Sequence, residues 1–264
     1  MKILILGGTG DALSIAKTLI EAGHDITYSI AGIVRQPKLD CRILSGGFRV
    51  QQTMSGEKHF ANGAEGMQWH LQQEAYDLIV DATHPYAVQI SKNIVVAAKQ
   101  VGVAAWRYLR EPWNQTDQDN WLEFDSMEDI ISKLKPYKKP FFTVGREAFS
   151  NTDLRDSGQQ WLVRSAGVET ANSPAIIELK GIGPFTIEDE LALFKLHGVD
   201  VLISKNSGAE AVAAKLEAAR LVDIPVFFLS RPVKAPADLS FTSTQALIEQ
   251  INSPSTPFNN KFTG

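Results

Sequence analysis

The chain lacks most features that mark secreted, membrane-spanning or metal-rich proteins. Cys41 is its single cysteine, which excludes an internal disulfide framework and a cysteine-based zinc cluster. No segment approaches the roughly 20 apolar residues that cross a bilayer. The short aliphatic run before the first glycine pair is also too brief for a secretory signal. These absences favour a cytoplasmic protein without a membrane partner.

An excess of positive charge is also missing. The 26 Lys and Arg residues are outnumbered by 30 Asp and Glu residues, giving a net charge of −4 and a pI near 5.8. Because general nucleic-acid binding needs a basic field, no nucleic-acid partner is expected. The G-x-S-x-G, G-x-x-x-x-G-K and H-E-x-x-H motifs are absent, and the histidines show no metal-ligand spacing. No metal site is predicted.

The sequence does contain a regular alternation of short apolar runs and segments in which apolar residues recur with the spacing of a helix. This alternation is typical of an α/β fold. Parallel strands joined through helices are expected, because tight hairpins cannot connect parallel neighbours. The predicted strands are 2–6, 25–30, 41–44, 78–81, 103–107, 121–124, 141–144, 161–164, 176–179, 201–204 and 225–229. The predicted helices are 11–22, 85–100, 187–197 and 209–221.

The alternation is interrupted at residues 108–121, which have no periodic apolar face. Since a typical sheet holds about five or six strands, this many strands predicts two domains with mainly parallel sheets. We expect an N-terminal dinucleotide-binding domain over 1–107, a C-terminal domain over 108–252 and a disordered tail over 253–264.

A glycine-rich turn, Gly7-Gly8-Thr9-Gly10, follows the first predicted strand and opens the first helix. Glycines in this position let the backbone approach a pyrophosphate, whose charge the amides at the helix start can bind. Gly8, Thr9 and Gly10 are therefore predicted to contact a dinucleotide. The motif is degenerate, because Leu13 occupies the place of the third glycine, and the alternative is a simple turn.

The end of the second strand bears on the choice of cofactor. NAD sites usually carry an acidic residue about 20 residues beyond the glycines, which binds the ribose 2′-hydroxyl. Residues 28–35 contain no carboxylate, whereas Ser29 and Arg35 can receive a 2′-phosphate. NADPH is the predicted cofactor, with NADH as the alternative, and Arg35 as a solvated loop residue is the competing interpretation.

Two further loops lie between a predicted strand and a helix. In residues 81–86, Thr83 or His84 can cap the helix and Pro85 suits its first turn, but this does not explain why polar groups gather at a strand's carboxyl end. In residues 204–208, Ser207 with Glu210 fits a capping box. That reading leaves Lys205 unexplained.

Cations also follow several other strands. Together with Lys205, they predict a small polyanionic ligand in a cleft between the domains. The arginines concerned are Arg107, Arg110, Arg146, Arg164 and Arg231.

With these motifs assembled, the chain resembles the precorrin-6A reductase family of cobalamin biosynthesis over almost its whole length. The resemblance rests on Ile5-Leu-Gly-Gly-Thr-Gly10, Gly46-Gly-Phe48, Asp81-Ala-Thr-His-Pro-Tyr86 with Ser91 and Asn93, Arg110-Glu-Pro-Trp113, Phe142-Thr-Val-Gly145, Gly183-Pro-Phe185, Lys205-Asn-Ser-Gly208, Ala218-Ala-Arg220 and Ser230-Arg-Pro232. Leu13 and Arg49 depart from the family pattern, where arginine and glycine respectively are common.

The resemblance implies two Rossmann-like domains that bind NADPH and a polycarboxylate tetrapyrrole between them. Hydride transfer to a ring double bond of precorrin-6A then gives precorrin-6B. Thr83 and Ser91 join the expected cofactor contacts, and Lys205 is expected to act electrostatically or as a proton donor. The expected substrate contacts are His84, Arg110, Arg146, Lys205, Ser207 and Arg231.

Two functions of other classes compete with this prediction. A non-catalytic NADP-binding sensor would carry the same turn. The sequence shows no obvious catalytic dyad that would exclude such a sensor. A methyltransferase using S-adenosylmethionine usually has an acidic residue before the first glycine, where this chain has only aliphatic residues. The oligomeric state stays open, with a monomer among the alternatives.

Overall fold

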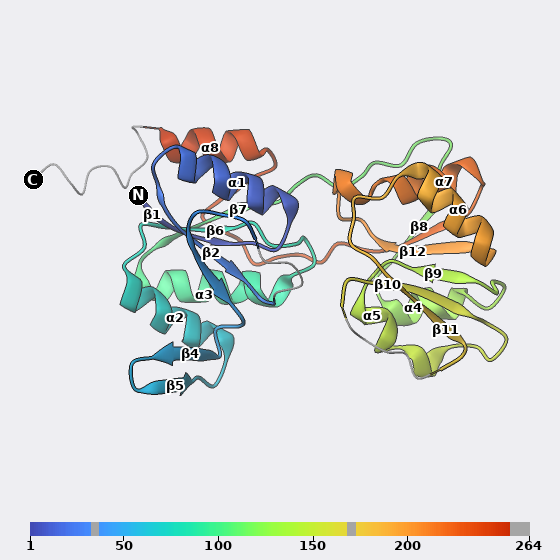
Figure 1. Cartoon of the computed structure of the whole chain (residues 1–264), viewed down its shortest axis with the longest axis horizontal. Helices are drawn as coiled ribbons and strands as arrows, with labels where there is room; N and C mark the ends of the chain where they lie inside the picture. Colours follow the sequence, from blue (N-terminus) through green and yellow to red (C-terminus); the bar gives the residue numbers. More distant parts are fainter. Residues whose placement is uncertain (33–36, 168–172, 254–264) are drawn as a thin grey trace, which may run out of the picture. The chain divides into compact units, whose positions relative to one another are not determined.

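The computed structural model describes residues 1–32, 37–167 and 173–253 and divides into two compact units. Unit 1 comprises Met1–Glu111 and the chain from Pro232 onward, and unit 2 comprises Pro112–Arg231. Each contains a six-stranded sheet with helices (Figure 1). The α/β class with parallel sheets is confirmed. Among the described residues, no helix has both the length and the apolar character of a membrane span.

Unit 1 carries its sheet in the strand order β14-β7-β6-β1-β2-β3, with every pairing parallel. The antiparallel pair β4-β5 forms a separate hairpin. The bounds are β1 Lys2–Leu6, α1 Gly10–Glu21, β2 Asp25–Ile30, β3 Arg42–Ser45, β4 Val50–Thr53, β5 Gly56–His59, α2 Gly63–Glu74, β6 Leu78–Asp81, α3 Val88–Val101, β7 Ala104–Tyr108, β14 Leu239–Phe241 and α8 Thr244–Asn252.

Alternating side chains of β1 build the two halves of the unit 1 core. Ile3 and Ile5 pack in one cluster with residues of α1 and α8, whereas Leu4 and Leu6 pack in another with residues of α2 and α3. Figure 1 shows the two helix pairs on opposite faces of the sheet. Because β1 is covered on both faces, it reads as a continuous aliphatic run, and the sequence predicts its bounds correctly.

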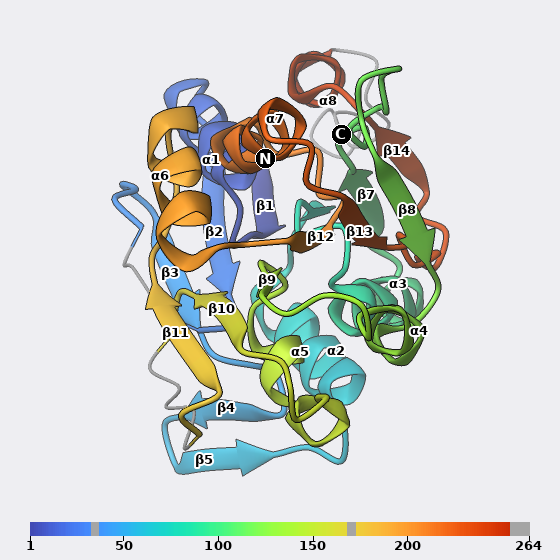
Figure 2. The same cartoon turned by 90° about the vertical axis from the view of Figure 1, so that its right-hand side faces the viewer.

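Unit 2 has the strand order β11-β10-β9-β12-β13-β8, again with parallel pairings throughout. Figure 2 shows β8 and β11 at the two edges. The bounds are β8 Trp121–Phe124, α4 Met127–Lys133, β9 Pro140–Phe142, α5 Arg146–Phe149, η1 Thr152–Leu154, β10 Trp161–Ser165, β11 Ile176–Lys180, α6 Ile187–His197, β12 Val201–Lys205, η2 Glu210–Val212, α7 Ala214–Leu221 and β13 Val226–Leu229.

The last strand and helix belong to unit 1. The expectation that the C-terminal domain extends to residue 252 therefore differs from the structure, in which unit 2 ends at Arg231. β14 pairs with β7, and α8 packs on the same core as α1. The first crossing also lies later than expected, between Glu111 and Pro112 rather than after residue 107. An edge strand of three residues carries too little pattern to show which sheet it joins. The expected tail lies outside the described residues from 254 onward.

Candidate functional site

The carboxyl ends of four strands in unit 1 lie at one edge of the sheet, together with the glycine turn, Ser29 and the 81–86 loop. Leu6 at the end of β1 is in register with Ser29 of β2 and with Asp81 of β6. Asp81 is in turn in register with Arg107 of β7. Open α/β sheets bind ligands at this edge, so the fold places the glycine turn and the 81–86 loop where a cofactor is expected.

The glycine turn is built on the side chain of Tyr28, which is fully buried beneath it. A Cβ atom on Gly7 would lie 2.1 Å from the Tyr28 hydroxyl oxygen. The same oxygen accepts a hydrogen bond from the Gly8 N–H at 3.0 Å, and Gly8 has a φ of 104°. Burial raises the pKa of Tyr28, so the hydroxyl keeps its proton. Sequence reasoning missed Tyr28, because within β2 it reads as an ordinary core residue.

Beyond Gly8, the turn becomes the start of α1. The Thr9 hydroxyl accepts a hydrogen bond from the Ala12 N–H and donates one to the Ala82 carbonyl, each at 3.1 Å. Thr9 thereby caps the helix and ties the glycine turn to the 81–86 loop. The Gly10 and Asp11 amides belong to the first turn, which has no carbonyl partner within the helix. A Cβ atom on Gly10 would meet nothing within 4 Å. Helix starts of this kind can bind phosphate groups, and contact of this one with a dinucleotide stays a prediction.

Arg110 lies at the same helix start. Its Nη1 is 2.8 Å from the Asp11 carboxylate, which belongs to the first turn of α1. The structure therefore places this predicted substrate contact in unit 1, beside the predicted phosphate site. Burial, followed by the Asp11 charge and a hydrogen bond to it, raises the pKa of the neighbouring Tyr108 to about 12.

A buried charge network centres on Asp81, whose side chain is 1% exposed. Its oxygens accept hydrogen bonds from Thr83 Oγ1 at 2.6 Å, Ser91 Oγ at 2.7 Å and Arg107 Nε at 2.9 Å. Lys234 Nζ lies 3.9 Å from Asp81 Oδ2 and donates to Thr83 Oγ1 at 3.2 Å. Burial opposes ionisation of Asp81, but the Lys234 charge and these hydrogen bonds outweigh it and lower the pKa.

This network gives Thr83 and Ser91 a role that the sequence does not reveal. Both hydroxyls are turned onto Asp81, and Ser91 has no exposed surface. In this arrangement they shape the loop beside the glycine turn. Lys234 was missed by sequence reasoning, because it lies 153 positions from Asp81 along the chain. Its position just beyond Ser230-Arg-Pro232 is the one feature of the sequence that could have pointed to Lys234 as a site residue.

The expectation that Thr83 or His84 caps the helix is wrong, as is the expectation that Pro85 occupies its first position. Helix α3 begins at Val88, its N-cap is Ala87, and no side chain caps it. His84 Nδ1 instead accepts a hydrogen bond from the Tyr86 N–H at 3.3 Å. The hydrogen bonds to Asp81 and the hydrogen bond within this local turn hold the loop in a non-helical conformation.

The two residues predicted to bind a 2′-phosphate differ in how far the structure describes them. Ser29 lies at the carboxyl edge, where its carbonyl accepts a hydrogen bond from the Gly7 N–H at 2.9 Å, and it is 4% exposed. Arg35 falls outside the described residues. Contact of either residue with a cofactor stays a prediction.

In unit 2, Lys205 and Arg146 lie at the carboxyl edge of neighbouring strands. Lys205 is the last residue of β12, and Arg146 opens α5 shortly after β9, where Gly145 has a φ of 70°. Lys205 Nζ is 2.6 Å from Glu147 Oε2, with 22% of the lysine side chain exposed. The sequence indicates the cation but not the carboxylate that holds it.

The residues after Lys205 do not form the expected capping box. Ser207 Oγ accepts from the Ala209 N–H at 3.4 Å, and the short helix η2 begins after Ala209 without a side-chain cap. The expected helix over 209–221 is therefore divided into η2 and α7. Ser207 is 5% exposed in this loop.

Asn206, between Lys205 and Ser207, is the principal residue that sequence reasoning missed. Its Oδ1 accepts from the Trp113 N–H at 2.8 Å, and its Nδ2 donates to the Trp113 carbonyl at 2.9 Å. Its own carbonyl accepts from Arg231 Nε at 2.6 Å. Arg231, expected to bind substrate, thus contributes to the structure of this loop.

Arg164, the last but one residue of β10, is paired with the buried carboxylate of Glu190. Its guanidinium makes two hydrogen bonds to Glu190, at 2.6 and 2.8 Å, and lies 4.0 Å from the centre of the Phe185 ring. Lys215 is buried nearby. Burial lowers its pKa to about 8, with the Glu190 charge opposing and the Arg164 charge adding to the effect.

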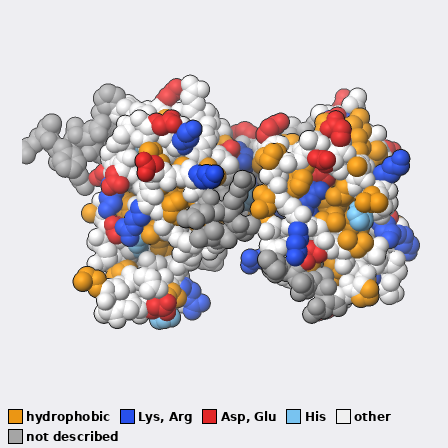
Figure 3. All heavy atoms as spheres, viewed as in Figure 1, with side chains coloured by type: hydrophobic (Ala, Val, Ile, Leu, Met, Phe, Trp, Pro, Cys, Tyr) orange, Lys and Arg blue, Asp and Glu red, His pale blue; other side chains and the backbone are white. Residues whose placement is uncertain are grey.

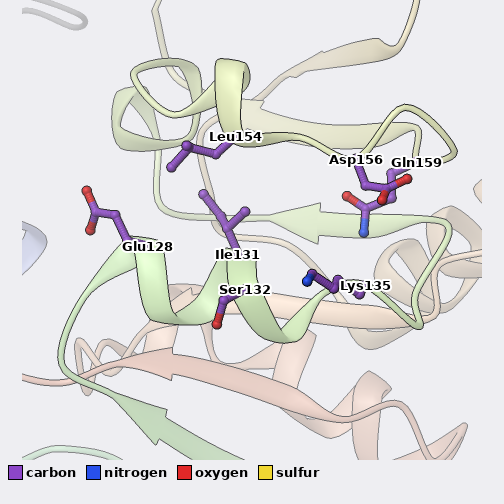
Figure 4. A pocket seen from close by; sticks show the side chains of 7 residues that line it. All are labelled: Glu128, Ile131, Ser132, Lys135, Leu154, Asp156 and Gln159. Carbon is purple, nitrogen blue, oxygen red and sulfur yellow. The ribbon is translucent and has the colours of Figure 1, made fainter.

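The surface shows no single-sign field on the face seen in Figure 3, where acidic and basic side chains are interspersed over each unit. A hollow of about 330 Å³ lies in unit 2 between α4 and the segment after α5 (Figure 4). Its lining includes none of the predicted site residues. Within the described ranges, no three His, Cys, Asp or Glu side chains gather as a metal site.

Known proteins resemble the chain over nearly its full length. A precorrin-6A reductase of Rhodococcus erythropolis is 36% identical, with 89% of this chain and 91% of the relative covered. One of Sinorhizobium sp. is 33% identical, over 90% and 87%. The solved structure of CobK precorrin-6A reductase is similar with a TM-score of 0.77 at 27% identity, covering 94% of each chain. The family described as Precorrin-6x reductase CbiJ/CobK matches residues 2–252, and the chain belongs to this family.

Proposed function

We propose that this protein is a precorrin-6A reductase of cobalamin biosynthesis, which uses NADPH to reduce one ring double bond of precorrin-6A and forms precorrin-6B. The observation that carries the proposal is the open helix start at Gly10, at the carboxyl edge of the unit 1 sheet, in a chain of this reductase family. NADPH supplies the hydride when it is bound. The expected cytoplasmic location and a monomeric state stay predictions.

The cofactor is assigned to unit 1. The Gly10 and Asp11 amides can donate to the pyrophosphate, aided by the partial positive charge of the helix start. The Gly8 amide is already bonded to Tyr28, so its contribution is to shape the turn. Ser29 and Arg35 are proposed to hold the 2′-phosphate, because no carboxylate at the end of β2 repels it.

The macrocycle is assigned to the basic residues of the strand-end loops. Arg146 is exposed at the start of α5, next to the Lys205–Glu147 pair. A polycarboxylate can compete with Glu147 for Lys205, whose charge then lies beside the substrate. We assign Lys205 an electrostatic or proton-donating role, and His84, Arg110, Ser207 and Arg231 supporting contacts. The protein's main contribution is alignment, which is worth up to about 7–11 kcal/mol in favourable reactions.

The test is to mix the purified protein with NADPH and precorrin-6A. Equal loss of NADPH and of precorrin-6A supports the reductase, and NADH in a parallel reaction measures the preference for the phosphate. A sensor would bind NADPH and leave its absorbance unchanged, which would overturn the proposal.

Variants test the role of Lys205. Lys205→Ala should lower turnover more than NADPH affinity, because its charge is proposed to act on the macrocycle. Lys195→Ala, at an exposed position on α6, is the matched control and should leave both unchanged. Unchanged turnover in Lys205→Ala would contradict the assigned role.

A further inference from the structure

The chain enters and leaves unit 2 at two points that are joined by one residue, Asn206. Pro112 is the first residue of the unit and Arg231 is the last. Asn206 bonds both backbone groups of Trp113, next to the entry, and its carbonyl accepts from Arg231 at the exit. These contacts connect three segments that are distant in sequence.

The chemistry of this junction requires an amide side chain. Trp113 presents one N–H donor and one carbonyl acceptor, and a carboxamide supplies the matching acceptor and donor together. Asn206 is 5% exposed, so water cannot readily replace a lost bond. Aspartate keeps the acceptor and loses the donor, whereas alanine loses both.

The Trp113 ring is held as well. Lys215 Nζ lies 5.6 Å from the centre of a Trp113 ring, and Phe228 of β13 packs against the indole with a ring separation of 6.3 Å. These contacts hold Trp113 in place on unit 2. Through its two hydrogen bonds to Trp113, Asn206 is held in place as well, and with it the loop that follows β12.

Lys205 ends β12 opposite Leu229 of β13, and beyond it the loop contains little regular structure that could fix it otherwise. The Ser207 N–H bonds back to the Lys205 carbonyl at 2.8 Å, and Gly208 has a φ of 67°. Lys205 and Ser207 are covalent neighbours of Asn206. A displacement of Asn206 would act first on the backbone of these two neighbours, and through it on the Lys205 ammonium group beside Glu147 and on the Ser207 hydroxyl.

From this geometry we propose that Asn206 is a positioning residue for the reduction. Its hydrogen bonds to Trp113, in the entry segment, and to Arg231, at the exit, hold Lys205 and Ser207 where they can contact the macrocycle. The proposal rests on the proposed function. Asn206 acts through its neighbours, and its loss should lower kcat while NADPH binding in unit 1 is kept.

The experiment compares Asn206→Asp and Asn206→Ala with the wild type in the full-length protein. We measure kcat and KM for precorrin-6A, the Kd for NADPH and the melting temperature. A misplacement of about 1 Å can cost about a hundredfold in rate, so kcat should fall by roughly tenfold to a hundredfold. The loss should be smaller for Asn206→Asp, which keeps one bond to Trp113. The Kd for NADPH should stay within about twofold, since these contacts lie in the other unit.

Gln159 provides a matched control. It is a buried amide in unit 2, 4% exposed, that donates to the Leu134 and Tyr137 carbonyls and accepts from Trp161 Nε1. Gln159→Leu should lower the melting temperature and leave kcat unchanged at a temperature where the protein is folded. This separates positioning from general loss of stability.

Three results would count against the proposals in distinguishable ways. Folded Asn206 variants with wild-type kcat would overturn the positioning role, as would an equal loss of kcat in Gln159→Leu. If Asn206→Ala does not fold, Asn206→Asp alone decides the question by the same criterion. A wild-type protein that does not oxidise NADPH with precorrin-6A would instead overturn the proposed function.

Discussion

The Tyr28 hydroxyl oxygen accepts a hydrogen bond from the Gly8 N–H at 3.0 Å, inside the turn that was expected to offer its amides to a pyrophosphate. The tyrosine ring also occupies the space that a side chain on Gly7 would need. Gly7 and Gly8 are therefore explained by the fold itself. No contact within the fold requires a glycine at position 10. Of the glycines in this turn, Gly10 is therefore the one whose presence points most directly to a bound ligand.

Gly7→Ala should destabilise unit 1, because the new Cβ atom would lie 2.1 Å from the Tyr28 hydroxyl oxygen. Overpacking of this kind costs about 1–3 kcal/mol. Calorimetric unfolding of Gly7→Ala, Tyr28→Leu and the double variant measures their coupling. The double variant should lose less stability than the two single variants added together. Strict additivity would show that the two positions do not oppose each other.

Gly10→Ala should fold normally, because its Cβ atom meets nothing within 4 Å, and should weaken NADPH binding by blocking approach to the amides. Quenching of tryptophan fluorescence on titration with NADPH gives the Kd, which we expect to rise by at least about tenfold, equal to about 1.4 kcal/mol. Gly167→Ala, an equally unobstructed glycine of unit 2, should bind NADPH like the wild type. Equal affinities for all three proteins would remove Gly10 from the site.

Asp81→Asn should destabilise the protein by about 3–5 kcal/mol, because it leaves the buried Arg107 and Lys234 charges without a carboxylate. Glu21→Gln is the comparison. It breaks the exposed pair with Lys17 and should change stability by less than about 0.5 kcal/mol. Melting temperatures of the two variants and the wild type provide the measurement. Similar shifts in both would contradict the charge network.

The lowered pKa of Asp81 also fixes the sign of its pH dependence. Because the carboxyl ionises more readily in the folded chain, its stabilising contribution is present above the ordinary pKa of 3.8 and is lost as the pH falls through the lowered value. Asp81→Asn should therefore lose part of the acid sensitivity of the wild type.

Lys215 should make the stability of unit 2 rise with pH. Its pKa is about 8 in the folded chain and 10.5 ordinarily, so the unfolded chain binds more protons between these values. The difference corresponds to about 3 kcal/mol at neutral pH. Lys215→Met should be more stable than the wild type at pH 7, and the advantage should shrink as the pH rises from 8 toward 10.5. A constant difference across this range would exclude Lys215 as the titrating group.

Much of the fold follows from local patterns, because buried parallel strands must be continuously apolar. For this reason Lys2–Leu6 and Leu78–Asp81 have the predicted bounds. The edge strand Trp121–Phe124, which is not buried, and helix α6, Ile187–His197, also have the predicted bounds. The exposed β4-β5 hairpin carries no such pattern and was not predicted. Helix α2 was missed as well, because its apolar face is narrow.

The candidate site shows the same division. Strand-end loops with glycine, lysine or aspartate are visible in the sequence, because sheet topology places such loops at one edge. The partners of their side chains are not visible. Asp81 meets Lys234 only because the chain returns from unit 2 to unit 1, whereas Asn206 and Trp113 lie 93 positions apart and meet within unit 2.

The sequence by itself determined the fold class, the glycine turn and the family, since each depends on residues close together or on an ordered series of motifs. Only the tertiary structure decided that Tyr28 supports that turn, that Asn206 joins two connecting segments and that the last strand returns to unit 1. Long-range hydrogen bonds and the choice of an edge strand's partner depend on which surfaces meet in three dimensions, and a linear pattern does not contain that information.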